Sequence, residues 1–536
     1  MMTPDIGKLI HYLKGLRAFL GKRLTYEEGR DIIIKRLAMR EQLFLDFLKL
    51  GVYGNEEGPY AKMLSASGIG YRDVESLVRE AGIEGALKSL AEKGIYLTVD
   101  EFKGRADYKR NGLTVRFNES DFDNVSGPGF LSRSGGTRSR GTHVFFNFEH
   151  IEETAPYTLI IYEVFSLQDA PCVVWFPAGL GLYIVLSEIK LGKAPLRWFS
   201  QVDWTFQLSN KPMGRLRDQL MEAATRIICL TRGVRFPRPE YVPLDETEKV
   251  VDFLAELSKK HRKFCVKTYP SSALRAAKIA REKGKSIRGA YFLIGGEPVT
   301  EAKKIEIERS GAKVVPNYSS MEAGYMSIGC GSPKVPDDTH ILADGTALIQ
   351  HRRKVASIGC EVDSNLVTTF LPKASKVLLN VEMGDTGVLE GRGCGCGWER
   401  LGFLGHIHTI RSFEKMTGEG MTMLNSDILR IVEEVLPARF GGSMTDYQIL
   451  EEEDEGGVTS VKLLVSPELG GLDEKKILSV LVQELRAAGK GGGSSNLSLD
   501  VWVQNNTLKI VREYPKTTAV GKIFTFQIGR KEEIRH

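Results

Sequence analysis

The chain has 536 residues, 42% of them hydrophobic, which is enough for more than one buried core and for roughly two to four domains. Its 73 basic and 68 acidic side chains leave a net charge of only +5, which argues against a nucleic-acid partner. The uncharged run 172–187 is shorter than the ~20 residues of a membrane span and contains Pro177, so we expect a buried strand followed by a turn there.

The N-terminal residues lack the continuous apolar stretch of a secretory signal, and we therefore expect a cytoplasmic protein. Seven cysteines, an odd number, argue against a disulfide framework. They favour either reduced thiols or a metal site.

Helical spacing of Leu, Lys, Arg and Glu predicts a helical layer over residues 1–100. From 100 to about 400, strand-like apolar runs alternate with helical ones, which predicts an α/β architecture. The predicted strands are residues 158–165, 226–232, 290–296, 312–318 and 346–352.

A second pattern begins after residue 405 and predicts a small, separate α+β domain. Its expected helices are 423–436 and 474–489, and its expected strands are 447–453, 458–466, 497–504 and 508–513. The glycine-rich run 489–496 lies between elements of one kind, so we interpret it as a loop inside this domain.

The segment SRSGGTRSRGT, residues 132–142, combines glycines with hydroxyl and basic side chains. Glycines let a backbone approach phosphate oxygens closely, and Ser134, Thr137 and Arg140 can donate hydrogen bonds to them. This composition indicates a triphosphate-binding loop, although taken alone it also fits a solvated loop.

Three later segments supply further groups for a nucleotide site. In NYSSMEAG, Tyr318 can stack on a purine and Glu322 can hold a magnesium ion, since a strand end is expected there. In MGDTG, Asp385 can accept hydrogen bonds from ribose hydroxyls. In YPKTTAVGKI, Lys522 can approach an α-phosphate and a carboxylate while charge develops between them. Each carboxylate alone also fits an ordinary turn.

With the turn IGGEP at 294–298, these segments occur in a fixed order that resembles the adenylate-forming superfamily of acyl-CoA synthetases, nonribosomal-peptide adenylation domains and luciferases. The pattern is most similar to the phenylacetate-CoA ligase branch, over residues 100–536. The resemblance implies a large α/β N-terminal domain, residues 1–404 including the helical entry layer, and a small α+β C-terminal mobile lid, residues 405–536.

The resemblance also implies the residues of an ATP site. Lys522, Glu322 and Thr137 would be catalytic, and Glu322 would hold magnesium. The nucleotide-binding residues would be Ser134, Gly136, Thr137 and Arg140 in the phosphate loop, Gly295, Gly296 and Glu297 at the adenine, Tyr318, and Asp385 at the ribose.

The chain departs from the family pattern at the expected hinge. The family usually has Gly-Arg-x-Asp there, whereas this chain reads GHIHTIRS from Gly405. Arg411 or His406 is a candidate for the missing ribose contact. The phosphate loop also has Arg138 and Ser139 in place of the usual Thr-Gly.

A possible metal site lies beside the nucleotide segments. Cys394 and Cys396 flank one glycine, and Cys330 and His340 follow the Glu322 segment. Three sulfurs and one imidazole suit tetrahedral zinc, although a C-x-C pair alone is a weak signal. The phenylacetate-CoA ligase branch carries a similar arrangement, so the resemblance implies a structural zinc site.

The expected reaction joins a carboxylic acid to ATP and passes the resulting acyl group to coenzyme A or to the phosphopantetheine of an acyl carrier protein. Phe145, Phe146 and Phe148 would favour an aryl or hydrophobic acid, unless they belong to the core. Two alternatives stay open. One is an acyl-protein synthetase that acylates a partner's cysteine, and the other is a degenerate nucleotide-binding scaffold without turnover.

Overall fold

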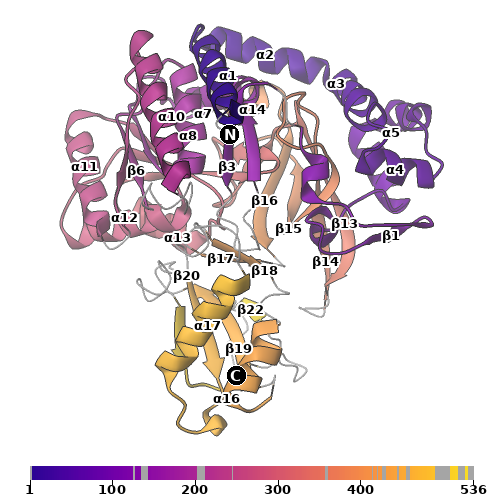
Figure 1. Cartoon of the computed structure of the whole chain (residues 1–536). Coiled ribbons are helices and arrows are strands. Elements are labelled where there is room, and N and C mark those ends of the chain that lie inside the picture. Colours follow the sequence, from indigo (N-terminus) through magenta and orange to yellow (C-terminus); the bar gives the residue numbers. More distant parts are fainter. Residues whose placement is uncertain are drawn as a thin grey trace.

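The computed structural model describes residues 3–124, 127–133, 143–201, 212–243, 246–355, 360–412, 415–418, 421–424, 430–443, 446–453, 459–488, 508–516 and 526–528. The chain forms a large α/β body followed by a small C-terminal body with its own sheet (Figure 1). The predicted combination of a large α/β unit and a small α+β unit is confirmed.

A mixed sheet of twelve strands forms the centre of the large body, in the order β13-β14-β15-β16-β12-β11-β10-β9-β8-β5-β6-β7. The half from β10 to β7 is parallel, and the other half is antiparallel. The parallel strands are β5 (Cys172–Trp175), β6 (Arg197–Ser200), β7 (Pro239–Tyr241), β8 (Phe264–Thr268), β9 (Ala290–Ile294) and β10 (Lys313–Ser320). The others are β11 (Gly324–Gly329), β12 (Thr339–Ile341), β13 (Thr346–Val355), β14 (Cys360–Thr369), β15 (Leu378–Gly391) and β16 (Gly405–Ser412).

Both faces of the parallel half are apolar because helices cover both of them. In β5, for example, Cys172 and Val174 pack in one core, and Val173 and Trp175 pack in the other. The first core includes α7 (Phe148–Val164) and α8 (Ala178–Lys190), and the second includes α11 (Thr247–Lys260), α12 (Pro270–Glu282) and α13 (Glu301–Glu308). The strand order reverses between β5 and β8. The carboxyl ends of the parallel strands are therefore the expected place for a ligand.

Two strand predictions are wrong. Residues 158–165 lie almost entirely in α7, and residues 226–232 lie largely in α10 (Pro212–Thr231). In the run 172–187, a strand is followed by the start of α8 rather than by a turn alone. Residues 158–162 are all buried, and a buried helix and a buried strand show the same lack of periodicity over such lengths. In 226–232 the apolar residues Ile227 and Leu230 are instead largely exposed on α10, so the apolar run there does not reflect burial.

Helices dominate the first hundred residues: α1 (Thr3–Phe19), α2 (Tyr26–Ala38), α3 (Arg40–Phe47), η1 (Leu48–Tyr53), α4 (Pro59–Ala66), α5 (Tyr71–Glu92) and α6 (Val99–Phe102). A capping box of Thr25 with Glu28 starts α2, and one of Thr98 with Glu101 starts α6. Residues from α3 to α6 share a third core with β13, β14 and β15. The part of the helical layer from α3 to α6 therefore covers the antiparallel half of the sheet, whereas α1 and α2 contribute to the first core.

Short hairpins accompany the large sheet: β1 (Tyr108–Arg110) with β2 (Leu113–Val115), β3 (Gly129–Arg133) with β4 (His143–Asn147), and β17 (Lys415–Gly418) with β18 (Met421–Leu424). The 3-10 turn η2 (Glu119–Phe122) follows β2, and the short helix α14 (Gly397–Arg400) lies between β15 and β16. No helix among the described ranges is both long and apolar enough to cross a bilayer.

The small body holds a four-stranded sheet in the order β21-β20-β19-β22. Its elements are η4 (Arg430–Val435), α16 (Leu436–Phe440), β19 (Tyr447–Glu453), β20 (Thr459–Val465), η6 (Pro467–Leu469), α17 (Glu474–Ala488), β21 (Leu508–Val511) and β22 (Phe526–Ile528). The expected helix 423–436 begins instead with the end of β18, and the strand expected at 497–504 lies outside the described residues. Strand β16 pairs with β12 and β15, so the large sheet extends to Ser412.

Candidate active site and metal centre

A glycine turn follows β9 at the carboxyl edge of the parallel strands. A Cβ atom at Gly295 would lie 2.1 Å from the side-chain oxygen of Asn317, so only glycine fits beneath that amide. Gly296 has a φ of +85°, which glycine adopts without strain. The Glu297 carboxylate accepts hydrogen bonds from Ser271 N at 2.9 Å and Ser271 Oγ at 2.8 Å, which fixes the turn to the first turn of α12.

Tyr318 and Asp385 meet at the same edge, although 67 residues separate them. The Tyr318 hydroxyl donates to Asp385 Oδ2 at 3.2 Å, and the tyrosine side chain is buried. Burial and the nearby carboxylate raise the pKa of Tyr318 well above its usual range, so the phenol keeps its proton. Tyr318 is therefore placed to orient the Asp385 carboxylate.

Glu322 lies in the turn between β10 and β11, and its carboxylate is already paired. Lys103 Nζ lies 2.5 Å from Glu322 Oε1 and 2.9 Å from Glu119 Oε1. A second lysine also neutralises Glu119. Lys376 Nζ lies 3.7 Å from Glu119 Oε1 and 2.5 Å from Asp123 Oδ1. No local sequence pattern identifies Lys103 as a site residue, because 219 residues separate it from Glu322.

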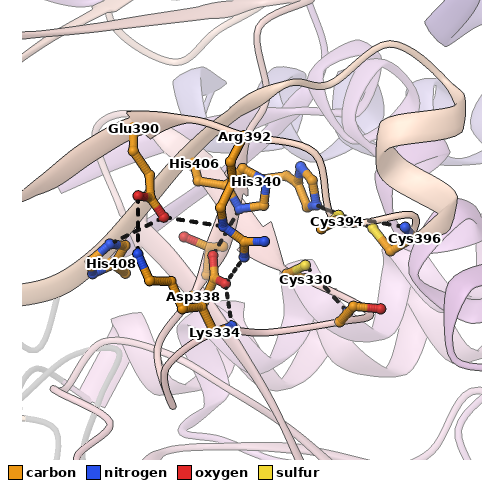
Figure 2. A network of polar contacts seen from close by, with 12 residues as sticks. Cys330, Lys334, Asp338, His340, Glu390, Arg392, Cys394, Cys396, His406 and His408 are labelled. Atoms are coloured by element: carbon orange, nitrogen blue, oxygen red, sulfur yellow. Dashed lines mark hydrogen bonds and ion pairs between the residues drawn. The ribbon is translucent and has the colours of Figure 1, made fainter.

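The four proposed zinc ligands come together in the fold. The ligand atoms of Cys330, His340, Cys394 and Cys396 all lie within 4.8 Å of one another. His340 Nε2 lies 3.4 Å from Cys394 Sγ and 3.2 Å from Cys396 Sγ (Figure 2). These separations suit donor atoms arranged around one tetrahedral ion.

Hydrogen bonds around the cluster orient these donors toward its centre. His340 Nδ1 lies 2.9 Å from the Phe403 carbonyl, an arrangement that leaves Nε2 free as a ligand when Nδ1 carries the proton. Ser332 N donates to Cys330 Sγ at 3.3 Å, and Cys396 N donates to Cys394 Sγ at 3.5 Å. The residue types and their orientation therefore fit a zinc ion.

A hydrogen bond between the thiols of Cys330 and Cys396 shifts their pKa values in opposite directions. The hydrogen bond from Cys330 and the contact with His340 lower the pKa of Cys396 to about 2. The same bond, together with burial, raises the pKa of Cys330 well above its usual range. A divalent cation would replace such shared protons, because a coordinated thiol loses its proton outright.

A second group of polar side chains lies beside the cysteines, around Asp338 (Figure 2). Asp338 accepts from Lys334 N at 2.7 Å, pairs with Arg392 and contacts His406 Nδ1 at 2.8 Å. Asp338, His340 and His406 are all fully buried. The sequence pattern did not indicate Asp338, because a single aspartate in a loop carries no ligand spacing.

The two candidates for the missing ribose contact are engaged elsewhere. His406 is held by Asp338, and Arg411 Nη1 lies 2.9 Å from Asp337 Oδ2. Arg411 is in register with Thr386, whereas the residue directly opposite Asp385 is Ser412. Side chains alternate between the faces of a strand, so this register directs Arg411 to the face opposite Asp385.

The remaining predicted residues are Ser134, Gly136, Thr137 and Arg140 of the phosphate loop and Lys522, and all lie outside the described part of the chain. Of the three phenylalanines, Phe148 packs with Tyr12 and Phe19 in the core. Phe146 stacks with the His150 ring at 6.2 Å and lies 4.7 Å from the Tyr183 ring, measured between centroids. Phe146 and Phe148 are therefore both buried in the first core.

No family model and no curated protein matches the sequence. Among solved structures, 72% of the chain aligns with 66% of a mutant amide bond synthetase, Mcba from Marinactinospora thermotolerans, at 13% identity and a TM-score of 0.35. Another alignment covers 77% of the chain and 68% of the anthranilate CoA ligase AuaEII in complex with anthranoyl-AMP, at 12% identity and a TM-score of 0.30. A third covers 74% of the chain and 68% of a mutant o-succinylbenzoate CoA synthetase from Bacillus subtilis, at 11% identity and a TM-score of 0.39. At these low scores the alignments assign no activity, and the proposal below depends on the residues of this chain.

Proposed function

We propose that the protein activates a carboxylic acid with ATP to form an acyl-adenylate, and then transfers the acyl group to a thiol. The observation that carries the proposal is the meeting of Tyr318 with Asp385 on the sheet edge where the turn at Gly295 also lies. A nucleotide needs a close-fitting glycine backbone and a fixed carboxylate for its ribose, and an α/β sheet binds ligands at this edge. A small α+β body after the large sheet provides the second part of a two-domain ligase.

In the first step, a carboxylate oxygen forms a bond to the α-phosphorus, and the bond to pyrophosphate breaks. Asp385, oriented by Tyr318, would accept hydrogen bonds from the ribose. Gly295 and Gly296 would line the adenine, and Lys522 would stabilise charge on the reacting oxygens. In the second step, a thiol sulfur bonds to the acyl carbon and AMP leaves.

We further propose that Glu322 holds the magnesium ion that accompanies ATP. Its ion pair with Lys103 must then open, or the ammonium and the metal must share the carboxylate. Glu119 offers Lys103 a second partner at 2.9 Å, so the lysine can stay neutralised after Glu322 turns to the metal.

A zinc ion held by Cys330, His340, Cys394 and Cys396 is also part of the proposal. Four protein donors leave no open position, so its role would be structural. Elemental analysis of purified protein tests this. The variant Cys394→Ser should lose the metal, whereas Cys229→Ser, which removes a buried thiol elsewhere, should keep it. A purified protein that is fully stable and active without metal would contradict the proposed zinc site.

For the acceptor we propose coenzyme A or a carrier-protein phosphopantetheine, and for the acid an aryl or hydrophobic carboxylate, as in the phenylacetate-CoA ligase pattern. ATP–pyrophosphate exchange over a panel of aryl and aliphatic acids tests the activation step. Asp385→Asn should lower exchange strongly, while Asp252→Asn, a change of an exposed side chain on α11, should not. Absence of exchange with every acid would reduce the protein to a nucleotide-binding scaffold.

Lys522→Ala separates the two half-reactions. Adenylation should fall far more than thiol transfer from a preformed acyl-adenylate, because the lysine would act in the adenylation step, on the α-phosphate and the attacking carboxylate. Equal losses in both steps would contradict this role. Acyl transfer to a protein cysteine without free coenzyme A would instead assign an acyl-protein synthetase.

A further inference from the structure

The loop between β11 and β12, residues 330–340, carries a proposed metal ligand at each end, Cys330 and His340. Between them lie two consecutive aspartates, Asp337 and Asp338, with exposed fractions of 6% and 0%. Buried carboxylates must be paired or hydrogen-bonded, so the partners of these two show what the loop holds.

The partners of Asp337, and one partner of Asp338, belong to β16, which is the last strand of the large sheet in chain order and lies between β15 and β12. The pairing of β15 with β16 shifts register at Gly387, which faces both Thr409 and Ile410. This is a β-bulge, and a bulge leaves backbone groups without their ladder partners. Thr409 also has a φ of +53°, a left-handed conformation that is rare for a β-branched residue.

Asp337 supplies the acceptors that the ladder lacks. Its Oδ1 accepts from Thr409 N at 2.9 Å, and its Oδ2 accepts from Ile410 N at 3.0 Å. Oδ2 also pairs with Arg411 Nη1 at 2.9 Å. One carboxylate therefore satisfies both free amides of the bulge and holds the strained residue in place.

Asp338 attaches the same loop at two other points. It contacts His406 at the start of β16, and it pairs with Arg392 on the segment that leads to Cys394 and Cys396. The loop, the cysteine pair and β16 are thus connected by side chains that are buried or partly buried (Figure 2).

We infer that Asp337 is a positioning residue that fixes the bulge of β16, and that metal binding by the loop sets how firmly this bulge is held. The inference depends on the proposed metal site and extends it to a regulatory role. Without a shared ion, the ends of the loop are still held by the sheet pairing of β12 with β11 and β16, but the cysteine pair is joined to them through hydrogen bonds and the Arg392–Asp338 ion pair in place of metal bonds. The two aspartates then sit on a less firmly held loop.

The bulge has a direct structural link to the nucleotide site. On β16 it lies between His408 and Arg411, and the next residue, Ser412, is in register with Asp385. Beyond β16 the chain continues through β17 and β18 to the small body, and Lys522 falls in the sequence between β21 and β22 of that body. A metal-dependent bulge would therefore act on the ribose carboxylate and on the start of the connection to the catalytic lysine.

Amide hydrogen exchange by mass spectrometry of peptides covering 405–412 tests the inference on the full chain, without any turnover. Removing the metal with a chelator should speed exchange at Thr409 and Ile410 by about tenfold or more, the effect expected from losing a hydrogen bond to a charged acceptor. Asp337→Asn should cause the same increase while the zinc content stays unchanged. Asp252→Asn should change neither quantity.

Unchanged protection after chelation, or full protection in Asp337→Asn, would overturn the inference. Loss of zinc from Asp337→Asn would also overturn it, since the aspartate would then serve the ligands rather than the bulge. Absence of zinc from the purified protein would remove the proposed metal site, a result that elemental analysis reports independently of exchange. Normal pyrophosphate exchange alongside unchanged protection would refute this inference but not the proposed activity.

Discussion

Replacing Asp344 by asparagine should make the stability of the large body less dependent on pH. Asp344 lies between β12 and β13 and is fully buried. The Tyr157 hydroxyl lies 3.0 Å from each of its carboxylate oxygens, and Arg36 lies 3.8 Å away. Burial outweighs the attraction of Arg36 and raises the pKa of Asp344 from 3.8 to about 7.

The size of the effect follows from this shift. Between pH 4 and 7 the unfolded chain loses the Asp344 proton while the folded protein keeps it, so the free energy of unfolding falls as pH rises. A shift of roughly three pKa units corresponds to about 4 kcal/mol, since one unit is worth about 1.4 kcal/mol. Asparagine keeps the volume and an acceptor for Tyr157 but carries no charge, so the variant should escape this loss.

Urea unfolding followed by tryptophan fluorescence measures the difference. The wild-type midpoint should drop more steeply between pH 4 and pH 8 than the Asp344→Asn midpoint, and Asp31→Asn, an exposed change, should follow the wild type. Burial also raises the pKa of Glu153 to about 7. Glu153 therefore adds to the pH dependence of the wild type, but it is present in the variant as well. A wild-type–variant gap of equal size at pH 4 and pH 8 would refute the reasoning.

Three further predictions concern the proposed nucleotide site; the first two use ATP–pyrophosphate exchange and the third uses calorimetry. Tyr318→Phe removes the hydroxyl on Asp385 and should raise the KM for ATP about tenfold or more with little change in kcat, as expected for one hydrogen bond to a charged group. An unchanged KM would show that the Tyr318 hydroxyl does not support ATP binding through Asp385. Lys103→Met removes the cation on Glu322 and should lower the Mg²⁺ concentration needed for half-maximal rate, whereas Lys103→Arg should not; a higher requirement would contradict competition at this carboxylate. Gly295→Ala should abolish ATP binding by calorimetry while circular dichroism stays unchanged, because the added Cβ would meet a side-chain oxygen at 2.1 Å; normal binding would show that the turn does not line the nucleotide.

The sequence was sufficient for features with a local signature. Strand β19 occupies 447–453, the range predicted for it, and α17 ends one residue before its predicted end. Such segments combine regular periodicity with clear turn residues on both sides. The cysteine pair at 394 and 396 is likewise a local feature of the sequence, because a single glycine separates the two thiols. In the structure this glycine, Gly395, has a φ of +72°.

Pairings between distant segments could not be predicted in this way. Lys103 meets Glu322 only because the helical layer packs against the turn after β10, and neither residue has a distinctive neighbourhood in sequence. Segment 158–165 resembles a strand because it is apolar and buried on most sides of α7, a pattern that a buried strand shares. Segment 226–232 resembles one because of its apolar residues, although Ile227 and Leu230 are largely exposed on α10. Burial, which decides between these alternatives, depends on the whole fold.

The bulge in β16 connects these observations. Thr409 has a left-handed backbone conformation, and its own amide and that of Ile410 lack partners in the strand pairing, which would be unfavourable by itself. No feature of GHIHTIRS predicts this conformation. It persists because Asp337, a residue of another loop, accepts both hydrogen bonds. That loop begins and ends with proposed metal ligands, so the strain at Thr409 is balanced by a structure that a bound ion would complete. The segment GHIHTIRS, which differs from the hinge that the resemblance implies, and the loop with the proposed metal ligands would then be two parts of one arrangement.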